Sequence, residues 1–278
     1  MLARGGRGAR RAAAGLLWGL LALLEGWVPG PARADTPLPP EHFDVVVVDP
    51  GHGGEDQGAT GPGGLLEKDL VLDVAQRLAR RLRREGLRVV MTRSSDRFVS
   101  LEQRTAIANQ AHADLFLSIH ANASRYRRVR GTETFFASLE ATDEAARDLA
   151  AAENLAFGDK RALAARGDPL LAILGDLIVT EYLNDSQEFA RMVQVRLANA
   201  RGGRSRGVKQ APFVVLMGVR MPAVLVEIGF LTNAGEERAL RHNEQRERLA
   251  GGLADAVKAF RVRYEARLGP QPAAPGGD

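Results

Sequence analysis

The sequence predicts an α/β fold: a single domain on a mixed, mostly parallel sheet, with helices on both faces and one helical insertion. Short apolar runs rich in β-branched residues alternate with longer amphipathic segments along most of the chain. The first run, Val45–Val48, is apolar at every position, which is typical of a strand buried on both faces. A length of 278 residues with 45% hydrophobic content is enough for a sizeable core.

The first 34 residues are not expected to belong to that core. Arginines precede an apolar run from Ala12 to Leu24, and Ala32–Ala34 has the small-x-small form of a cleavage site. We interpret residues 1–34 as a secretory signal peptide and predict an exported protein. A retained membrane anchor is the alternative, although the apolar run is shorter than the ~20 residues that a membrane-spanning helix needs.

Removal of this leader changes the charge of the chain. The whole sequence has a formal net charge of +4, whereas residues 35–278 carry 33 basic and 33 acidic side chains. The basic leader is therefore no indication of nucleic-acid binding, and neither nucleic acid nor a membrane is an expected partner of the mature chain. Cysteine is absent, so any metal site must use histidine and carboxylate ligands.

After the leader, the first half of the chain alternates strands and helices. A polar, proline-rich linker at 35–42 precedes the first strand. Gly86 is expected to end the first helix, and Ser100 to cap the second, because Gln103 completes a capping box. The expected elements are strands at Val45–Val48, Leu87–Thr92, Asp114–His120 and Thr132–Ala137, and helices at Glu67–Glu85 and from Leu101 onward.

The second half is predominantly helical. Asn233 is expected to cap the C-terminal helices, and the proline- and glycine-rich residues 269–278 to form a disordered tail, so that the main domain is expected to span 43–268. The expected elements are helices at Ala141–Asn154, Pro169–Ala200 and Glu236–Leu268, an irregular stretch near 157–168, and strands at Phe213–Met217 and Ala223–Ile228.

Polar side chains stand where three of the predicted strands end. His52 follows the first strand, His120 ends the third, and Glu227 follows the apolar run 224–226. Glu67 opens the first long helix. The carboxyl ends of parallel strands meet at one sheet edge, where α/β folds bind ligands. Two histidines and a carboxylate are a common zinc ligand set, and a second carboxylate nearby can act as a general base.

Each of these residues also has an ordinary structural interpretation when taken alone. A histidine after Pro-Gly can hydrogen-bond its own turn, as His52 would, and His120 can be a satisfied strand-end histidine. Glu67 can be a first-turn glutamate favoured by the helix dipole. Glu227 is harder to explain in this way, because a carboxylate at the end of an apolar run needs a partner or solvent.

The stretches around these residues resemble the signature blocks of a known enzyme family. The resemblance is carried, in order, by Asp49–Gly54, Glu67–Lys68, Ser118–Asn122 and Val226–Leu231. Together they are similar to the blocks of the zinc-dependent N-acetylmuramoyl-L-alanine amidases of the cell-division type. The resemblance covers roughly residues 43–262 and favours a shared site over the separate structural interpretations.

The resemblance implies an enzyme that hydrolyses the amide between N-acetylmuramic acid and L-alanine in peptidoglycan, for cell-wall remodelling and daughter-cell separation. It implies that His52, Glu67 and His120 hold one Zn²⁺ ion and that Glu227 is the catalytic carboxylate. It also implies a location in the periplasm or cell envelope. Asn122 stands where some relatives have an aspartate near the metal, so a fourth protein ligand stays open.

The segment 140–185 is longer than an α/β connection requires, and we treat it as a helical insertion. Its first part resembles the regulatory segment of the cell-division amidases, in which a helix covers the active site until a protein activator displaces it. The resemblance implies autoinhibition, with Glu153 as the first candidate to block the open position of the zinc and Glu144 as the second. A plain structural helical hairpin is the alternative.

Two other functions stay open at this point. A metallopeptidase that cuts within the stem peptide would use the same ligands. A metal-free, peptidoglycan-binding regulator built on an inactive amidase is the second, although such a protein has no reason to retain all four of His52, Glu67, His120 and Glu227.

Overall fold

The computed structural model describes residues 42–156, 169–202 and 204–268. The predicted signal peptide, nearly all of the linker, the irregular stretch 157–168 and the C-terminal tail lie outside the described residues. All described elements belong to one compact unit, Pro40–Asp278. Within the described ranges, no helix combines the length and apolar character needed to cross a membrane.

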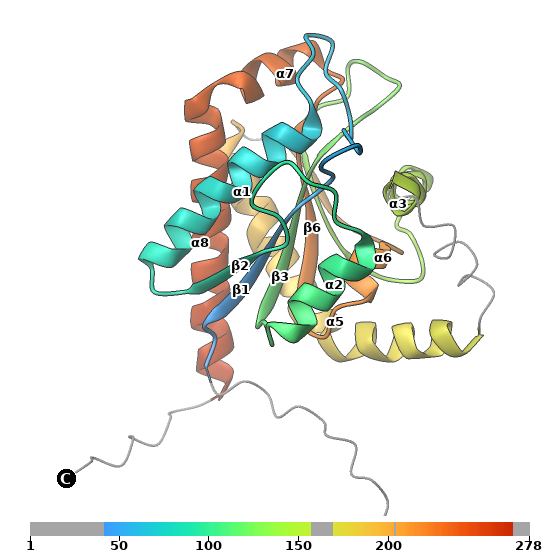
Figure 1. Cartoon of the computed structure of the whole chain (residues 1–278), viewed down its shortest axis with the longest axis vertical. Coiled ribbons are helices and arrows are strands. Elements are labelled where there is room, and N and C mark those ends of the chain that lie inside the picture. The colour runs from blue at the N-terminus through green and yellow to red at the C-terminus, as the bar shows by residue number, and fades with distance from the viewer. Residues whose placement is uncertain (1–41, 157–168, 203, 269–278) are drawn as a thin grey trace, which may run out of the picture. The chain divides into compact units, whose positions relative to one another are not determined.

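A six-stranded sheet with the order β2-β1-β3-β6-β4-β5 forms the centre of this unit (Figure 1). Neighbouring strands are parallel except β4 and β6, which are antiparallel. The predicted mixed, mostly parallel sheet is confirmed. The strands are β1 (Val45–Pro50), β2 (Arg88–Met91), β3 (Leu115–Asn122), β4 (Thr132–Ala137), β5 (Ser205–Ala211) and β6 (Ala223–Phe230).

Helices cover both faces of the sheet, as predicted. Figure 1 shows α1 and α8 on one side and α2, α3 and α6 on the other. We name these sides the α1 face and the α3 face. The α1 face packs against α1 (Glu67–Arg84), α5 (Pro169–Ala200), α7 (Ala234–Arg241) and α8 (Asn243–Leu268), and the α3 face against α2 (Leu101–Gln110), α3 (Glu144–Ala156) and α6 (Val214–Met217).

Strand alternation explains why the first strand is apolar at every position. Val46 and Val48 belong to the core of the α1 face, whereas Val45 and Val47 belong to the core of the α3 face. All four are buried. A strand between two helical layers therefore has no polar side, and its sequence shows no period of two.

The predicted helix boundaries at Ser100 and Asn233 are confirmed. The Ser100 hydroxyl accepts a hydrogen bond from the Gln103 backbone N–H, and the Gln103 side chain accepts one from the Ser100 N–H. Asn233 Oδ1 accepts from the backbone N–H groups of Gly235 and Glu236. Both helix starts are therefore marked by local signals in the sequence.

The predicted strand at Phe213–Met217 is wrong, because Val214–Met217 forms the short helix α6. The strand in this region is β5, which starts at Ser205. It is one of the two edge strands of the sheet and pairs with β4 alone among the described strands. An edge strand tolerates polar residues on most positions, so it lacks the apolar run that marks a central strand. The apolar residues of α6 pack on the α3 face instead.

Candidate metal centre and its cleft

The sheet brings two of the predicted site residues together on the α3 face. Side chains on a strand alternate between faces, so His120 points to the same side as Phe116, and Glu227 to the same side as Leu225. Phe116 and Leu225 are core residues of the α3 face. His120 and Glu227 are also register partners in the β3–β6 ladder, and both are buried.

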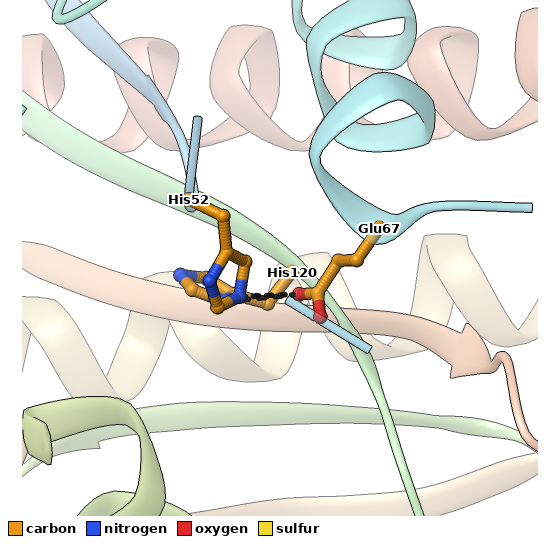
Figure 2. Close-up of side chains that lie close together, drawn as sticks. All are labelled: His52, Glu67 and His120. Atoms are coloured by element: carbon orange, nitrogen blue, oxygen red, sulfur yellow. Dashed lines mark ion pairs between the residues drawn. The ribbon is translucent and has the colours of Figure 1, made fainter. Parts of the chain in front are cut away.

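His52 and Glu67 reach the same place from a loop and a helix. His52 lies two residues after β1 with a φ of 59°, a left-handed conformation in which the chain turns sharply. Glu67 is the first residue of α1. His52 Nε2 lies 3.0 Å from Glu67 Oε1, and His120 Nδ1 lies 3.2 Å from the same oxygen. Figure 2 shows the three side chains pointing toward one another.

The neighbours of these side chains fix their orientation. Asp56 Oδ2 lies 2.8 Å from His52 Nδ1, which leaves Nε2 facing Glu67. The two Glu67 carboxylate oxygens accept hydrogen bonds from the backbone N–H groups of Ala59 and Ala121, at 2.8 and 2.9 Å. Such outer contacts hold metal ligands in the tautomer and direction that binding requires.

Two glycines allow the ligands to approach this closely. A Cβ at Gly51 would lie 2.3 Å from His120 Cε1, and a Cβ at Gly58 would lie 2.6 Å from His52 Cδ2. Gly58 also has a φ of +64°, which disfavours other residues. Any side chain at either position would displace a histidine ring.

The carboxylates around His52 and His120 favour a positive charge at this site. Burial disfavours a charged imidazole, but Glu67, Asp56 and Glu153 together raise the pKa of His52 to about 11. Burial opposes ionisation of Glu67 as well, yet His52 and His120 hold its pKa well below the usual range. In this state a proton on His52 supplies the positive charge that the buried carboxylates require.

The donor atoms fit a divalent metal ion. Ligand atoms of His52, Glu67 and His120 all lie within 4.8 Å of one another. His120 Nδ1 is buried and makes no hydrogen bond within the described part of the chain, although Glu67 and Glu153 oxygens lie 3.2 Å away. Two imidazole nitrogens and one carboxylate oxygen form a donor set that zinc accepts, with a position left for another ligand.

Glu227 lies beside this group as a buried carboxylate. Neither of its oxygens has a hydrogen-bond partner among the described residues. Burial, and the carboxylates of Glu67, Glu153 and Glu133, raise its pKa well above the usual value. Because Glu133 is its register partner across β4 and β6, Glu227 has acidic neighbours on two sides.

Glu153 extends from α3 to the same point. Its Oε2 lies 3.2 Å from His120 Nδ1 and 3.5 Å from His52 Nε2. The second sequence candidate, Glu144, is exposed on the wall of the same cleft, which has a volume of about 810 Å³. Of the two glutamates, the structure therefore brings Glu153 to the ligand group and leaves Glu144 at the surface.

Contacts at both ends hold α3 over the cleft. Asn154 donates to the Pro212 carbonyl and accepts from the Val214 N–H, both at 2.9 Å. At the other end, the Thr142 backbone N–H donates to the Gln210 carbonyl on β5 at 2.9 Å, and Asp143 caps the helix by accepting from the Ala146 N–H at 2.7 Å. The predicted start at Ala141 is therefore too early, and the helix runs to Ala156.

Sequence reasoning did not find several residues that shape this site. Asp56 stands four residues after His52, a spacing that could have suggested a partner for the ring. Asn154 carries no local signal, because its partners are backbone groups beyond 200. Glu133, Arg206 and Lys209 line the cleft near Asn122, and the last two lie on the unrecognised strand β5.

Comparison with known proteins places this geometry in a family. The family described as N-acetylmuramoyl-L-alanine amidase (Amidase_3) matches residues 46–259. The chain is 36% identical over 235 residues to the N-acetylmuramoyl-L-alanine amidase AmiC of Escherichia coli O6:H1, covering 84% of this chain and 55% of AmiC. It is 37% identical over 218 residues to AmiA of Escherichia coli K12, covering 78% of this chain and 75% of AmiA.

A solved structure agrees with these relatives. The catalytic domain of CwlV, an N-acetylmuramoyl-L-alanine amidase from Bacillus (Paenibacillus) polymyxa var. colistinus, is 31% identical with a TM-score of 0.60. The match covers 78% of this chain and 97% of that domain. The chain spans about half the length of the AmiC that it matches. By the extent of the family match and its identity to these relatives, the chain belongs to the N-acetylmuramoyl-L-alanine amidase family.

Proposed function

We propose that this protein is a zinc-dependent hydrolase that cleaves the amide between N-acetylmuramic acid and L-alanine in peptidoglycan. One observation carries the proposal: His52, Glu67 and His120 converge on one point, with the buried carboxylate of Glu227 beside it. Membership of the amidase family supports the substrate. Cell-wall remodelling and the separation of daughter cells follow as the proposed roles.

The residues of the chain divide the chemistry between them. When bound by His52, Glu67 and His120, zinc supplies a Lewis acid that polarises a carbonyl and lowers the pKa of water. Glu227 accepts a proton from the attacking water and delivers it to the leaving amine of L-alanine. A carboxyl group whose pKa lies above the usual value is suited to both transfers, since it can hold the proton between them.

We further propose that the enzyme is held inactive by α3. The carboxylate of Glu153 lies within 3.5 Å of both histidine nitrogens, which supports a role in blocking the open position of the metal. A protein activator that draws α3 away would open the site. The proposed setting is the periplasm or cell envelope after removal of residues 1–34.

Product analysis tests the proposed reaction. The mature chain, carrying Glu153→Gln to relieve the proposed block, is incubated with purified peptidoglycan, with and without a chelator, and the products are identified by mass spectrometry. We expect free stem peptides that begin with L-alanine, together with peptide-free glycan, and no such products after chelation. Products cut within the stem peptide would establish a metallopeptidase instead. A folded, zinc-free chain that binds peptidoglycan without cleaving it would establish the regulator.

Glu153→Gln tests the blocking role of α3. The substitution keeps the size of the side chain and removes the negative charge near the metal, so we expect the rate of release of stem peptides to rise severalfold without an activator. Glu144→Gln is the matched control, because Glu144 lies on the same helix but at the surface. Equal rates for Glu153→Gln and the unmodified chain would contradict autoinhibition by this residue.

A further inference from the structure

Lys209 on β5 forms two ion pairs within the active-site cleft. Its Nζ lies 2.9 Å from Glu133 Oε1 and 3.0 Å from Asp143 Oδ2. Glu133 belongs to the sheet and is buried, whereas Asp143 precedes α3 and is half-exposed. The ammonium group therefore joins the fixed wall of the cleft to the segment that covers it.

The charges of this cluster balance only while α3 is in place. Glu133 also pairs with Arg206, at 2.9 Å, and accepts a hydrogen bond from Asn122. Two cations, Arg206 and Lys209, thus face two carboxylates, Glu133 and Asp143. Withdrawal of Asp143 leaves two cations and one carboxylate in this cluster. A mostly buried ammonium that loses one carboxylate favours a replacement anion, because the remaining charge is only partly solvated.

The cluster opens into the same cleft as the metal ligands. Arg206, Lys209 and Glu133 line the cavity that also contacts His52 and Glu67. Asp143 and Glu153 are ten residues apart, which corresponds to roughly 15 Å along a helix. An extended peptide covers that distance in about four to five residues. A stem peptide bound at the metal by its lactyl end can therefore place a carboxylate near Lys209.

We propose that Lys209, supported by Arg206, is a subsite for a free carboxylate of the stem peptide, and that Asp143 fills this subsite while α3 is docked. The inference rests on the proposed amidase function and specifies its substrate. The covering segment then presents two carboxylates in the positions of substrate groups. Asp143 occupies the position of a stem-peptide carboxylate, and Glu153 occupies the position of the lactyl carboxylate that amide hydrolysis produces.

Peptide binding tests the subsite without requiring catalysis. The zinc-loaded mature chain carrying Glu153→Gln is titrated calorimetrically with the tripeptide L-alanyl-γ-D-glutamyl-diaminopimelate and with three monoamides, one at each of its three free carboxylates. Adding Lys209→Met is expected to lower the affinity for the free acid at least tenfold, as loss of a hydrogen bond to a charged group implies. It is expected to leave unchanged the affinity of the monoamide that lacks the recognised carboxylate.

Three further variants separate recognition from a structural effect. Lys258→Met, which removes an exposed lysine on α8, is the matched control and is expected to leave all four affinities unchanged. Lys209→Arg is expected to retain the preference for the free acid. Asp143→Asn in the chain with native Glu153 is expected to strengthen binding of the free acid. This variant tests the subsite if Lys209→Met does not fold. If Lys209→Met weakens the binding of all four peptides equally, or of none of them, the proposal is overturned.

Catalytic rates distinguish this proposal from the proposed function. With muropeptide substrates, Lys209→Met in the Glu153→Gln chain is expected to raise KM at least tenfold for the free acid and to leave kcat within twofold. If the chain cleaves no muropeptide but still discriminates acid from amide through Lys209, the amidase proposal fails and the subsite stands. If cleavage is normal and Lys209→Met changes neither KM nor affinity, the subsite fails and the amidase proposal stands.

Discussion

Glu227 is a carboxylate that the fold buries without a hydrogen bond from the described residues. Such a group destabilises the protein when ionised, so its place beside the ligand group has a chemical rather than a structural explanation. We expect Glu227→Gln to lower kcat about 10²- to 10⁴-fold, as loss of a general acid–base group does. The zinc content, measured by mass spectrometry of the intact protein, should not change. Normal turnover by the metal-loaded variant would refute the assignment.

The titration of His52 is expected to make metal binding depend on pH. Its pKa in the metal-free protein is raised to about 11, whereas a ligating imidazole must be neutral. Zinc binding near pH 8 should therefore release about one proton from His52, and the affinity should rise with pH. Calorimetric titrations in two buffers of different ionisation enthalpy measure that proton. His242→Asn, outside the site, should give the same release, and zinc binding without proton release would contradict the expectation.

The same shift affects the stability of the metal-free chain. A group whose pKa is higher in the folded state stabilises that state fully below its unfolded pKa, here 6.5, and the contribution disappears as pH rises through about 11. We expect the free energy of unfolding of the chelated protein to fall between these pH values. The fall should be smaller for His52→Gln in urea denaturation series. Identical slopes for both proteins would exclude His52 as the cause.

At the scale of elements, α3 is a helix held at its ends. Its apolar contacts with the α3-face core come from the buried Ala146 and Ala150 and from Leu149, which is partly buried. The two hydrogen bonds of Asn154 are each worth about 0.5–1.5 kcal/mol. Asn154→Ala should therefore raise the population with α3 displaced, and with it the activator-free rate, by roughly 5- to 160-fold.

Two measurements check the role of Asn154. The rate of stem-peptide release gives the activity, and hydrogen exchange of 144–156 reports the displacement of α3. Leu155→Gln is the matched control, since Leu155 is 53% exposed on the same helix. Faster exchange without higher activity would show that α3 is held by Asn154 but does not block the site.

The elements differ in how far their sequences define them. The Thr132–Ala137 strand and the Ser100 cap could be predicted to the residue, because apolar runs and capping boxes are local signals. β5 could not be predicted, because it is an edge strand that lines the cleft and its residues are mostly polar, without an apolar run. The resemblance was enough to name His52, Glu67, His120 and Glu227. It could not identify Lys209, because the proposed role of Lys209 depends on ion pairs with Glu133 and Asp143, which are distant in sequence.

At the scale of the whole molecule, Arg104 ties the helical layer to the carboxyl edge of the sheet. Its fully buried guanidinium donates to Asp49 Oδ1 at 2.7 Å and to the carbonyls of Pro50 and His52. Thr92 and Ser118 donate to the same Asp49 carboxylate. A single buried ion pair thus organises three neighbouring strands and the loop that carries a metal ligand.

Breaking that ion pair should unfold the protein more easily. Arg104→Met leaves a buried carboxylate without its cation, which costs about 3–5 kcal/mol. The free energy of unfolding of the chelated chain, measured in urea, should fall by that amount. Lys258→Met breaks an exposed ion pair with Glu85 and should cost at most about 1 kcal/mol. Equal losses for both variants would contradict the central role of Arg104.

The pairing of His120 with Glu227 in the β3–β6 ladder has a consequence for protein engineering. Adjacent strands lie about 4.8 Å apart, so backbone hydrogen bonds define the spacing between a metal ligand and the proposed base. Substitution of neighbouring side chains cannot adjust that spacing gradually, and a slip of one residue would turn a side chain to the opposite face. Redesign toward another amide substrate should therefore alter the cleft walls and leave these two strands untouched.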